Sequence, residues 1–380
     1  MTNFDNLPPI DTIPWHELDH AYGPATDVPA QINDLRSDDA DIRKQALWHL
    51  FGNIFHQGSR YPASPYAVPY LAQLLIDPDV NDKHHILTLL VNLALGYDEA
   101  YLPHGYPIDR YLDYFETNPP PNIDTWSLAE WQTYQAVRQQ LSTFIYSLSD
   151  DDPTVRRLAI YALAWFPQNV QQSWSHLHTT LTYDPQPVNQ ATALLTIAIL
   201  ANSDPQAPLD DLHDYLDHQY PLLQTSAALG LAIHHHYTTQ ILDLLLHALT
   251  HADLLQPQSE QIPFYDGNFT GLITTTLAQA PNEHHHLIIP HICQALHHVT
   301  GYDSLAVTRA LLDLIIDRQA PPLTETPSSQ LTPHQRLALN TIVNHGGWFI
   351  GEHIFGNYSS LLRRYGLPNN QADLRAYLLT

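Results

Sequence analysis

The sequence predicts an all-α protein, an α-α superhelix in which short helical hairpins are stacked as repeats. The first observation is a recurring pattern: an acidic residue, three spacers, an aliphatic residue, and then a helix of small or apolar residues. This pattern occurs at 38–50, 151–166, 184–200 and 217–233. Its aliphatic positions Val155, Val188 and Leu222 are 33 and 34 residues apart, which is the length of one helical hairpin.

The second observation is that each repeat begins with residues suited to a helix N-terminus. An Asp at this position accepts hydrogen bonds from the free amides of the first turn. Pro153 and Pro185 are expected just inside their helices, where the missing amide hydrogen does no harm. Small residues such as Ala159 and Ala193 allow close packing, and each hairpin needs a neighbour to cover its apolar face.

The third observation is helical periodicity between the clear repeats. Apolar residues recur at three- and four-residue steps, as at Ile241, Leu244, Leu245 and Leu249. The sequence contains no strong alternating pattern, bounded by hairpin turns, that would indicate a strand. We therefore expect further helices at 64–77, 82–96, 107–117, 125–149, 169–183, 237–254, 270–280, 284–299, 303–317 and 333–345.

The repeats and the composition divide the chain into three parts. Residues 1–317 are expected to form the repeat solenoid with an N-terminal cap. Residues 318–332 are rich in Pro, Ser and Thr, which is typical of a linker. Residues 333–380 are expected to form a C-terminal helical cap.

The charge of the chain restricts the class of partner. There are 39 acidic and 15 basic residues, and the formal net charge is -24. Nucleic acids and anionic membranes both require clustered Lys and Arg, so neither is an expected partner. A basic protein partner would be favoured, chiefly because opposite charge increases its association rate, although solubility is the simpler explanation of the charge.

The sequence favours a cytoplasmic protein. Cys293 is the single cysteine, so no intramolecular disulfide can form. The first residues, MTNFDNLPPIDTIPW, have neither the basic region nor the apolar core of a secretory signal. No apolar run approaches the roughly 20 residues that span a bilayer.

Four segments carry a resemblance to a known group. They are WHELDHAYGPATDVP (15–29), GNIFHQGSRYPASPYAVPYL (52–71), ALGYDEAYLPHG (94–105) and NYSSLLRRYGLP (357–368). With these segments the chain resembles bacterial HEAT-repeat proteins of uncharacterised function. The resemblance implies a superhelical scaffold and protein binding, and it brings no catalytic residues. HEAT-like enzymes that bind a small molecule or chromophore share the architecture, which leaves an enzymatic alternative open.

The run HELDH at 16–20 matches a metalloprotease motif. On a helix, His16 and His20 would lie one turn apart and could share a Zn²⁺, while Glu17 would polarise the attacking water. Flanking Pro and Gly residues leave barely two turns of helix, and no third ligand follows at close range. We therefore favour a short N-terminal helix with its polar residues outward, and we expect no metal or cofactor.

The best candidate for binding is the segment 56–64, HQGSRYPAS, between two apolar helices. Interfaces favour Tyr, Trp and Arg, and Gly58 permits a tight turn. Consecutive hairpins are expected to bring residues near 15–22 and 97–99 to a similar edge. The alternative is a loop held by its own hydrogen bonds, with Arg60 paired to Asp98 or Glu99. The predicted binding residues are Trp15, His20, Tyr22, His56, Gln57, Arg60, Tyr61, Tyr97, Asp98 and Glu99.

These observations favour a non-enzymatic scaffold that binds a protein or peptide. One concrete form is an inhibitor or immunity-type partner of a basic protein. The phosphate-binding loop GxxxxGK(S/T), the GxSxG elbow and the GxGxxG loop are missing from the sequence. The alternatives are a zinc-dependent hydrolase that uses the HELDH run, and a HEAT-like enzyme for a small molecule or chromophore.

Overall fold

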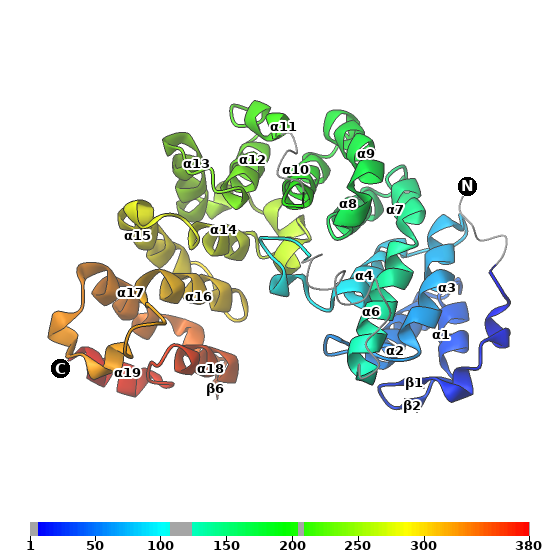
Figure 1. The fold of residues 1–380 in the computed structure, drawn as a ribbon, viewed down its shortest axis with the longest axis horizontal. Helices are drawn as coiled ribbons and strands as arrows, with labels where there is room; N and C mark the ends of the chain where they lie inside the picture. Colours follow the sequence, from blue (N-terminus) through cyan, green and yellow to red (C-terminus); the bar gives the residue numbers. More distant parts are fainter. Residues whose placement is uncertain (1–6, 107–123, 204–208, 380) are drawn as a thin grey trace. The chain divides into compact units, whose positions relative to one another are not determined.

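The computed structural model of the chain describes residues 7–106, 124–203 and 209–379, and most of these residues are α-helical. The chain divides into two compact units, Met1–Ala207 and Pro208–Thr380 (Figure 1). β-structure in the described ranges is limited to three two-stranded hairpins. No described helix has the length and apolarity needed to cross a membrane. The helix expected at 107–117 lies outside the described residues.

The first unit is built from helices that pack against their neighbours in the chain. The α1 helix contacts α2, α3 contacts α4, and α9 contacts α10; α6 lies against α3 and α4, and α8 against α4 and α10. The helices of this unit are α1 (Val28–Asp34), α2 (Ala40–Asn53), α3 (Ser64–Ile76), α4 (Lys83–Leu95), α6 (Thr125–Arg138), α7 (Leu141–Ser147), α8 (Pro153–Leu163), α9 (Val170–Tyr183) and α10 (Pro187–Ala201).

Two hairpins accompany the first unit, β1 (Asp19–His20) with β2 (Gly23–Pro24), and β3 (Phe55–His56) with β4 (Ser59–Arg60). The second unit carries β5 (Phe349–Ile350) with β6 (His353–Ile354). Its helices are α11 (Asp210–Asp214), α12 (Pro221–Ile233), α13 (Thr239–Thr250), α14 (Phe269–Leu277), α15 (His285–Leu296), α16 (Asp303–Ile315), α17 (Pro333–Asn344), α18 (Gly356–Arg364) and α19 (Gln371–Leu378).

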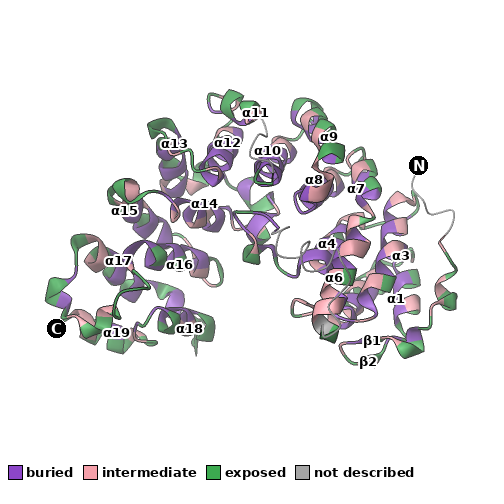
Figure 2. Cartoon of the chain, in the orientation of Figure 1, coloured by how far each residue is buried: buried purple, intermediate pink, exposed green. Residues whose placement is uncertain are grey.

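Burial follows the apolar pattern of each helix (Figure 2). The α10 helix is buried along nearly its whole length, because α8 and α9 both pack against it. The α13 helix buries Ile241, Leu245 and Leu249 and exposes Asp243 and His247. An all-apolar helix is therefore covered on several sides, and an amphipathic helix keeps one face in water.

The four repeat segments all contain a helix, but only two begin as predicted. Asp39 caps α2 by accepting from the Asp41 amide at 2.9 Å, and Asp152 caps α8 by accepting from the Thr154 amide at 2.8 Å. The α10 helix begins at Pro187, so the prediction that Pro185 lies inside it is wrong. The α10 and α12 helices have no side-chain cap at their N-termini.

An arginine links each of two repeats to the segment before a later helix. Arg156 Nε donates to Asp184 Oδ2 at 2.8 Å, and Arg43 Nε donates to Asp82 Oδ2 at the same distance. Both guanidinium groups also donate to the main-chain carbonyl six residues earlier, again at 2.8 Å. Arg43 and Arg156 occupy equivalent places in the segments DDADIR and DDPTVR. The sequence repeat is thus matched by a repeated polar contact.

One expected helix differs from its sequence-based description, and the structure adds detail to the segment expected as a linker. The single helix expected at 125–149 is interrupted at Gln139 and Gln140, which separate α6 from α7. The segment 318–332 lies within the second unit and contains two short 3₁₀ turns. Its carbonyls at Leu323 and Thr326 accept hydrogen bonds from the Tyr377 hydroxyl. Proline limits regular pairing, and such unpaired carbonyls remain available to side chains.

Candidate functional site

The β3–β4 hairpin places the central part of the predicted binding segment. Phe55 pairs with Arg60, and His56 with Ser59. Gln57 and Gly58 have φ values of 51° and 85°, which is the conformation of a two-residue hairpin turn. Alternation along the strands then buries Phe55 and Arg60 and leaves His56 and Gln57 at the tip.

Arg60 fastens this hairpin to the body of the first unit. Its guanidinium lies 3.5 Å from Glu130 Oε1 of α6 and also donates to the Gly58 carbonyl. Gly96, with φ of 79°, makes the approach possible, since a Cβ there would lie 2.6 Å from Arg60 Nη1. The pairing considered from sequence, with Asp98 or Glu99, is therefore not the one observed. Arg60 is 6% exposed, so it supports the site from below.

Exposed side chains from three segments meet around the hairpin tip. Tyr22, at the β1–β2 turn, is 70% exposed and packs edge-on to His56 with ring centroids 5.5 Å apart. Tyr97 is 55% exposed and lies against Gly58 and edge-on to Phe55, at 5.8 Å between centroids. We call Tyr22, His56, Gln57 and Tyr97 the hairpin edge. It presents two tyrosine rings, an imidazole and an amide on a rigid base.

His20 belongs to the buried base of the hairpin edge. Its Nδ1 accepts from the Tyr22 amide at 3.0 Å, so Nε2 carries the proton and donates to Asp27 at 2.9 Å. Asp27 also accepts from Gln31 at 2.7 Å and from Asn53 at 3.0 Å. This network fixes the β1–β2 hairpin against α1 and α2.

The helical interpretation of the HELDH run is wrong. Trp15–Glu17 form a single 3₁₀ turn, and Asp19–His20 form a strand, so His16 and His20 are not one helical turn apart. His16 is exposed, whereas both ring nitrogens of His20 are engaged. The described residues contain no group of three His, Cys, Asp or Glu side chains able to hold a metal ion.

Four predicted binding residues remain, of which three are buried and one is exposed. Trp15 is buried, and its indole N–H donates to the Ile10 carbonyl at 2.8 Å. Tyr61 is also in the core, where burial raises the pKa of its hydroxyl. Asp98 is buried and accepts from the Tyr161 hydroxyl at 2.9 Å. Glu99 is exposed, in the 3₁₀ turn Asp98–Ala100.

Sequence reasoning missed Glu130 and the strand character of residues 55–60. Glu130 lies 70 positions after Arg60, so the pair depends on α6 packing near β4. The hairpin did leave a signal, because Gln-Gly between FH and SR suits a two-residue turn. Strands of two residues are too short to show an alternating pattern.

Comparisons with known proteins assign no family to this chain. No family model matches it, and no curated protein matches it. Among solved structures, a crystal structure described as an engineered protein aligns over 93% of this chain and 94% of its own, with 15% sequence identity and a TM-score of 0.29. A similarity at that level supports no conclusion about fold or function.

Proposed function

We propose that this chain is a non-enzymatic HEAT-type repeat scaffold that binds a basic protein or peptide, and that it acts in the cytoplasm. The observation that carries the proposal is the hairpin edge. Tyr22 and Tyr97 keep large ring surfaces in water, while His20 and Arg60 hold their hairpins in place. Exposed tyrosines on a rigid base contact a partner at a low cost in conformational entropy.

The repeat architecture is supported by two features of the first unit. Successive helices contact each other in pairs, and Arg43 and Arg156 make equivalent contacts to Asp82 and Asp184. A stack of such hairpins offers an extended binding surface, which suits a protein partner better than a small substrate. The resemblance of the sequence to HEAT-repeat proteins points in the same direction.

The charge supports a basic partner. A formal charge of -24 creates a negative potential that accelerates encounter with cationic proteins. An inhibitor or immunity-type partner of a basic toxin is one form that this function could take. Binding of this kind weakens as salt shortens the range of the charges, so affinity is expected to fall between about 50 and 500 mM NaCl.

The test is capture of partners from native lysate on immobilised wild type and on a Tyr22→Ala/Tyr97→Ala double variant. A captured protein is then purified and its Kd measured against both. Loss of both tyrosine anchors is expected to weaken binding by roughly tenfold or more. Variants of Arg60 or Tyr61 are unsuitable here, because both side chains are buried and their loss would disturb folding.

The matched control is Tyr183→Ala/Tyr220→Ala, which removes two tyrosines that are exposed elsewhere on the chain. This control variant should bind as wild type does. Equal affinity of the hairpin-edge variant and wild type would reject the hairpin edge as the site. A captured partner that is acidic would reject the electrostatic part of the proposal.

A further inference from the structure

An apolar groove of about 580 Å³ lies between α2 and α4 of the first unit. Leu47, Trp48 and Phe51 of α2 line it together with Ile86 of α4. Trp48 is 72% exposed, which leaves a large apolar ring in water beside a preformed hollow. The nearby Arg43 already forms an ion pair with Asp82, so its charge is balanced without a carboxylate from a ligand. A ring in this position favours an apolar side chain from a partner.

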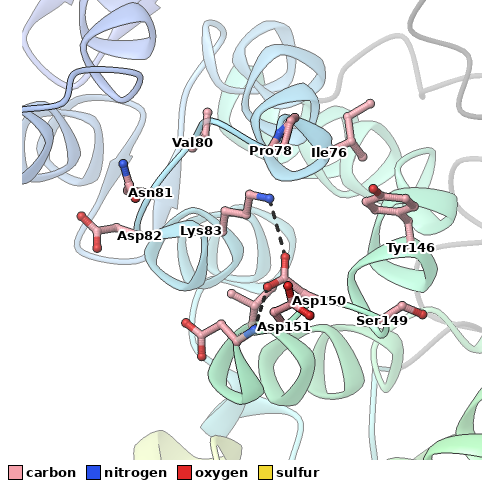
Figure 3. Close-up of a pocket in the computed structure, with 12 residues that line it drawn as sticks. Ile76, Pro78, Val80, Asn81, Asp82, Lys83, Tyr146, Ser149, Asp150 and Asp151 are labelled. Carbon is pink, nitrogen blue, oxygen red and sulfur yellow. Dashed lines mark hydrogen bonds and ion pairs between the residues drawn. The ribbon is translucent and has the colours of Figure 1, made fainter.

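Figure 3 shows a second, acidic pocket of about 500 Å³ in the first unit. Asn81 and Asp82 line both hollows, so the two are contiguous at the segment before α4. The pocket is also lined by three consecutive aspartates at 150–152 and by Lys83, which lies 3.6 Å from Asp150. One lysine therefore faces four aspartates, and negative charge is in excess.

The four carboxylates differ in whether they already form an ion pair or cap a helix. Asp150 is paired with Lys83, Asp82 with Arg43, and Asp152 caps α8. Asp151 is exposed, and no hydrogen bond or ion pair of its carboxylate is found within the described chain. Its carboxylate is thus available to a cation from outside, without breaking a contact of the fold.

Aromatic contacts in the interior link one residue of the groove to the hairpin edge. Phe51 of the groove packs edge-on to Phe55 with ring centroids 6.0 Å apart, and Phe55 packs edge-on to Tyr97 at 5.8 Å. Phe55 itself is buried, so these contacts couple the two sites through the interior of the first unit and do not join their surfaces.

We infer that the groove and the acidic pocket together bind a basic segment that carries one large apolar side chain. The apolar side chain packs against Trp48, and a neighbouring Lys or Arg pairs with Asp151. Apolar burial supplies the affinity, and the aspartates select a cationic sequence and reject an acidic one. The inference rests on the basic partner proposed above, but it assigns a separate surface to its recognition.

The probe is a library of random 12-residue peptides displayed for selection on the full-length wild-type chain. The selected peptides are sequenced, and the most enriched one is synthesised with a fluorescent label for anisotropy. Its Kd is measured with wild type, Trp48→Ala, Asp151→Asn and the control Tyr183→Ala, which removes an exposed ring outside the groove. Circular dichroism and thermal unfolding confirm that each variant is folded.

The expected peptides are rich in Lys or Arg and contain one aromatic residue or leucine. Trp48→Ala should weaken binding by roughly tenfold or more, as for a buried anchor. Asp151→Asn should weaken it by roughly threefold and reduce its dependence on salt, while Tyr183→Ala should leave it unchanged. Bound peptide should also protect Trp48 from acrylamide quenching, measured as the difference between wild type and Trp48→Phe.

Several results would overturn the inference: no selected peptide, peptides without basic enrichment, or Trp48→Ala binding within twofold of wild type. The outcomes also separate this inference from the proposed function. If only Tyr22→Ala/Tyr97→Ala loses the partner, the hairpin edge stands and the groove is rejected. If only Trp48→Ala loses it, the groove stands and the hairpin edge is rejected.

Discussion

At the scale of single residues, buried polar contacts give the hairpin edge its shape. Arg60 can approach Glu130 because Gly96 has no side chain to block its guanidinium. Asp27 accepts three side-chain hydrogen bonds next to the β1–β2 hairpin. Arg60 is buried, and Asp27, although exposed, is not one of the four residues of the hairpin edge. Of the ten residues predicted from sequence to bind, four form the hairpin edge, and two, His20 and Arg60, hold it in place.

Replacing Gly96 tests this support. Gly96→Ala forces an L-residue into a positive φ and places Cβ 2.6 Å from Arg60 Nη1, so it should lower the free energy of unfolding by about 2 kcal/mol or more. Gly52→Ala is the control, because Gly52 lies in α2 with no atom within 4 Å of a new Cβ. That change should be neutral or stabilise by up to about 1 kcal/mol. Equal effects in urea unfolding would contradict this account.

At the scale of elements, helices of the first unit are joined to later segments by ion pairs as well as by apolar packing. Asp184 is 9% exposed, and burial alone would raise the pKa of its carboxyl. Hydrogen bonds from Arg156, the Gln186 amide and Asn189 outweigh burial and hold that pKa below its usual range. The carboxylate therefore favours the folded state wherever it is ionised.

Asp184→Asn should lower the free energy of unfolding by about 3 kcal/mol at pH 7, because Arg156 would lose a buried partner. The folded pKa is lowered, so the stabilising contribution is complete above an unfolded pKa of about 3.9 and is lost as pH falls towards the folded value. The difference between wild type and variant should thus be constant from about pH 5 to 8 and shrink below about pH 4.

Urea unfolding at several pH values measures this difference. Glu17→Gln is the control, since Glu17 pairs with His16 and both side chains are more than two-thirds exposed. Its effect should stay within about 0.5 kcal/mol at every pH. A loss in Asp184→Asn as small as in this control would show that the repeat contact is not stabilising.

At the scale of the whole molecule, the chain consists of two compact units with their own cores, Met1–Ala207 and Pro208–Thr380. The first contains all the surfaces that we assign to binding. The second contains the 318–332 segment, which is hydrogen-bonded to α19 and α17. The predicted boundary between a repeat domain and a C-terminal cap thus falls inside one unit.

Expressed separately, residues 1–207 and 208–380 should each fold, because each buries its own apolar helices. Each fragment should show helical circular dichroism and one cooperative thermal transition. A fragment that ends at residue 163 is the control, since it removes α9 and α10 and uncovers α8. It should unfold at a lower temperature or aggregate. If the 1–207 fragment behaves like this control, the division into two units is wrong.

The sequence by itself determined the helical class and most helix positions, because apolar periodicity and capping residues act within a few positions of the chain. Helices expected at 64–77, 82–96 and 169–183 lie at Ser64–Ile76, Lys83–Leu95 and Val170–Tyr183. It also indicated the segment around His56 as a candidate binding site. Helix positions and turns depend on residues that are close in the sequence, so they can be predicted without knowledge of the tertiary structure.

Only the tertiary structure decided which residues of the candidate site are exposed. Arg60 and Tyr61 are of types common at interfaces, yet both are buried, and Arg60 and Asp98 have partners distant in the sequence. Trp48 is two positions from each of the buried residues Ala46 and Leu50, so it lies on the opposite side of α2, and only the packing of α4 shows that a groove lies beside it. Burial depends on packing between distant segments, and a single sequence carries little information about which segments meet.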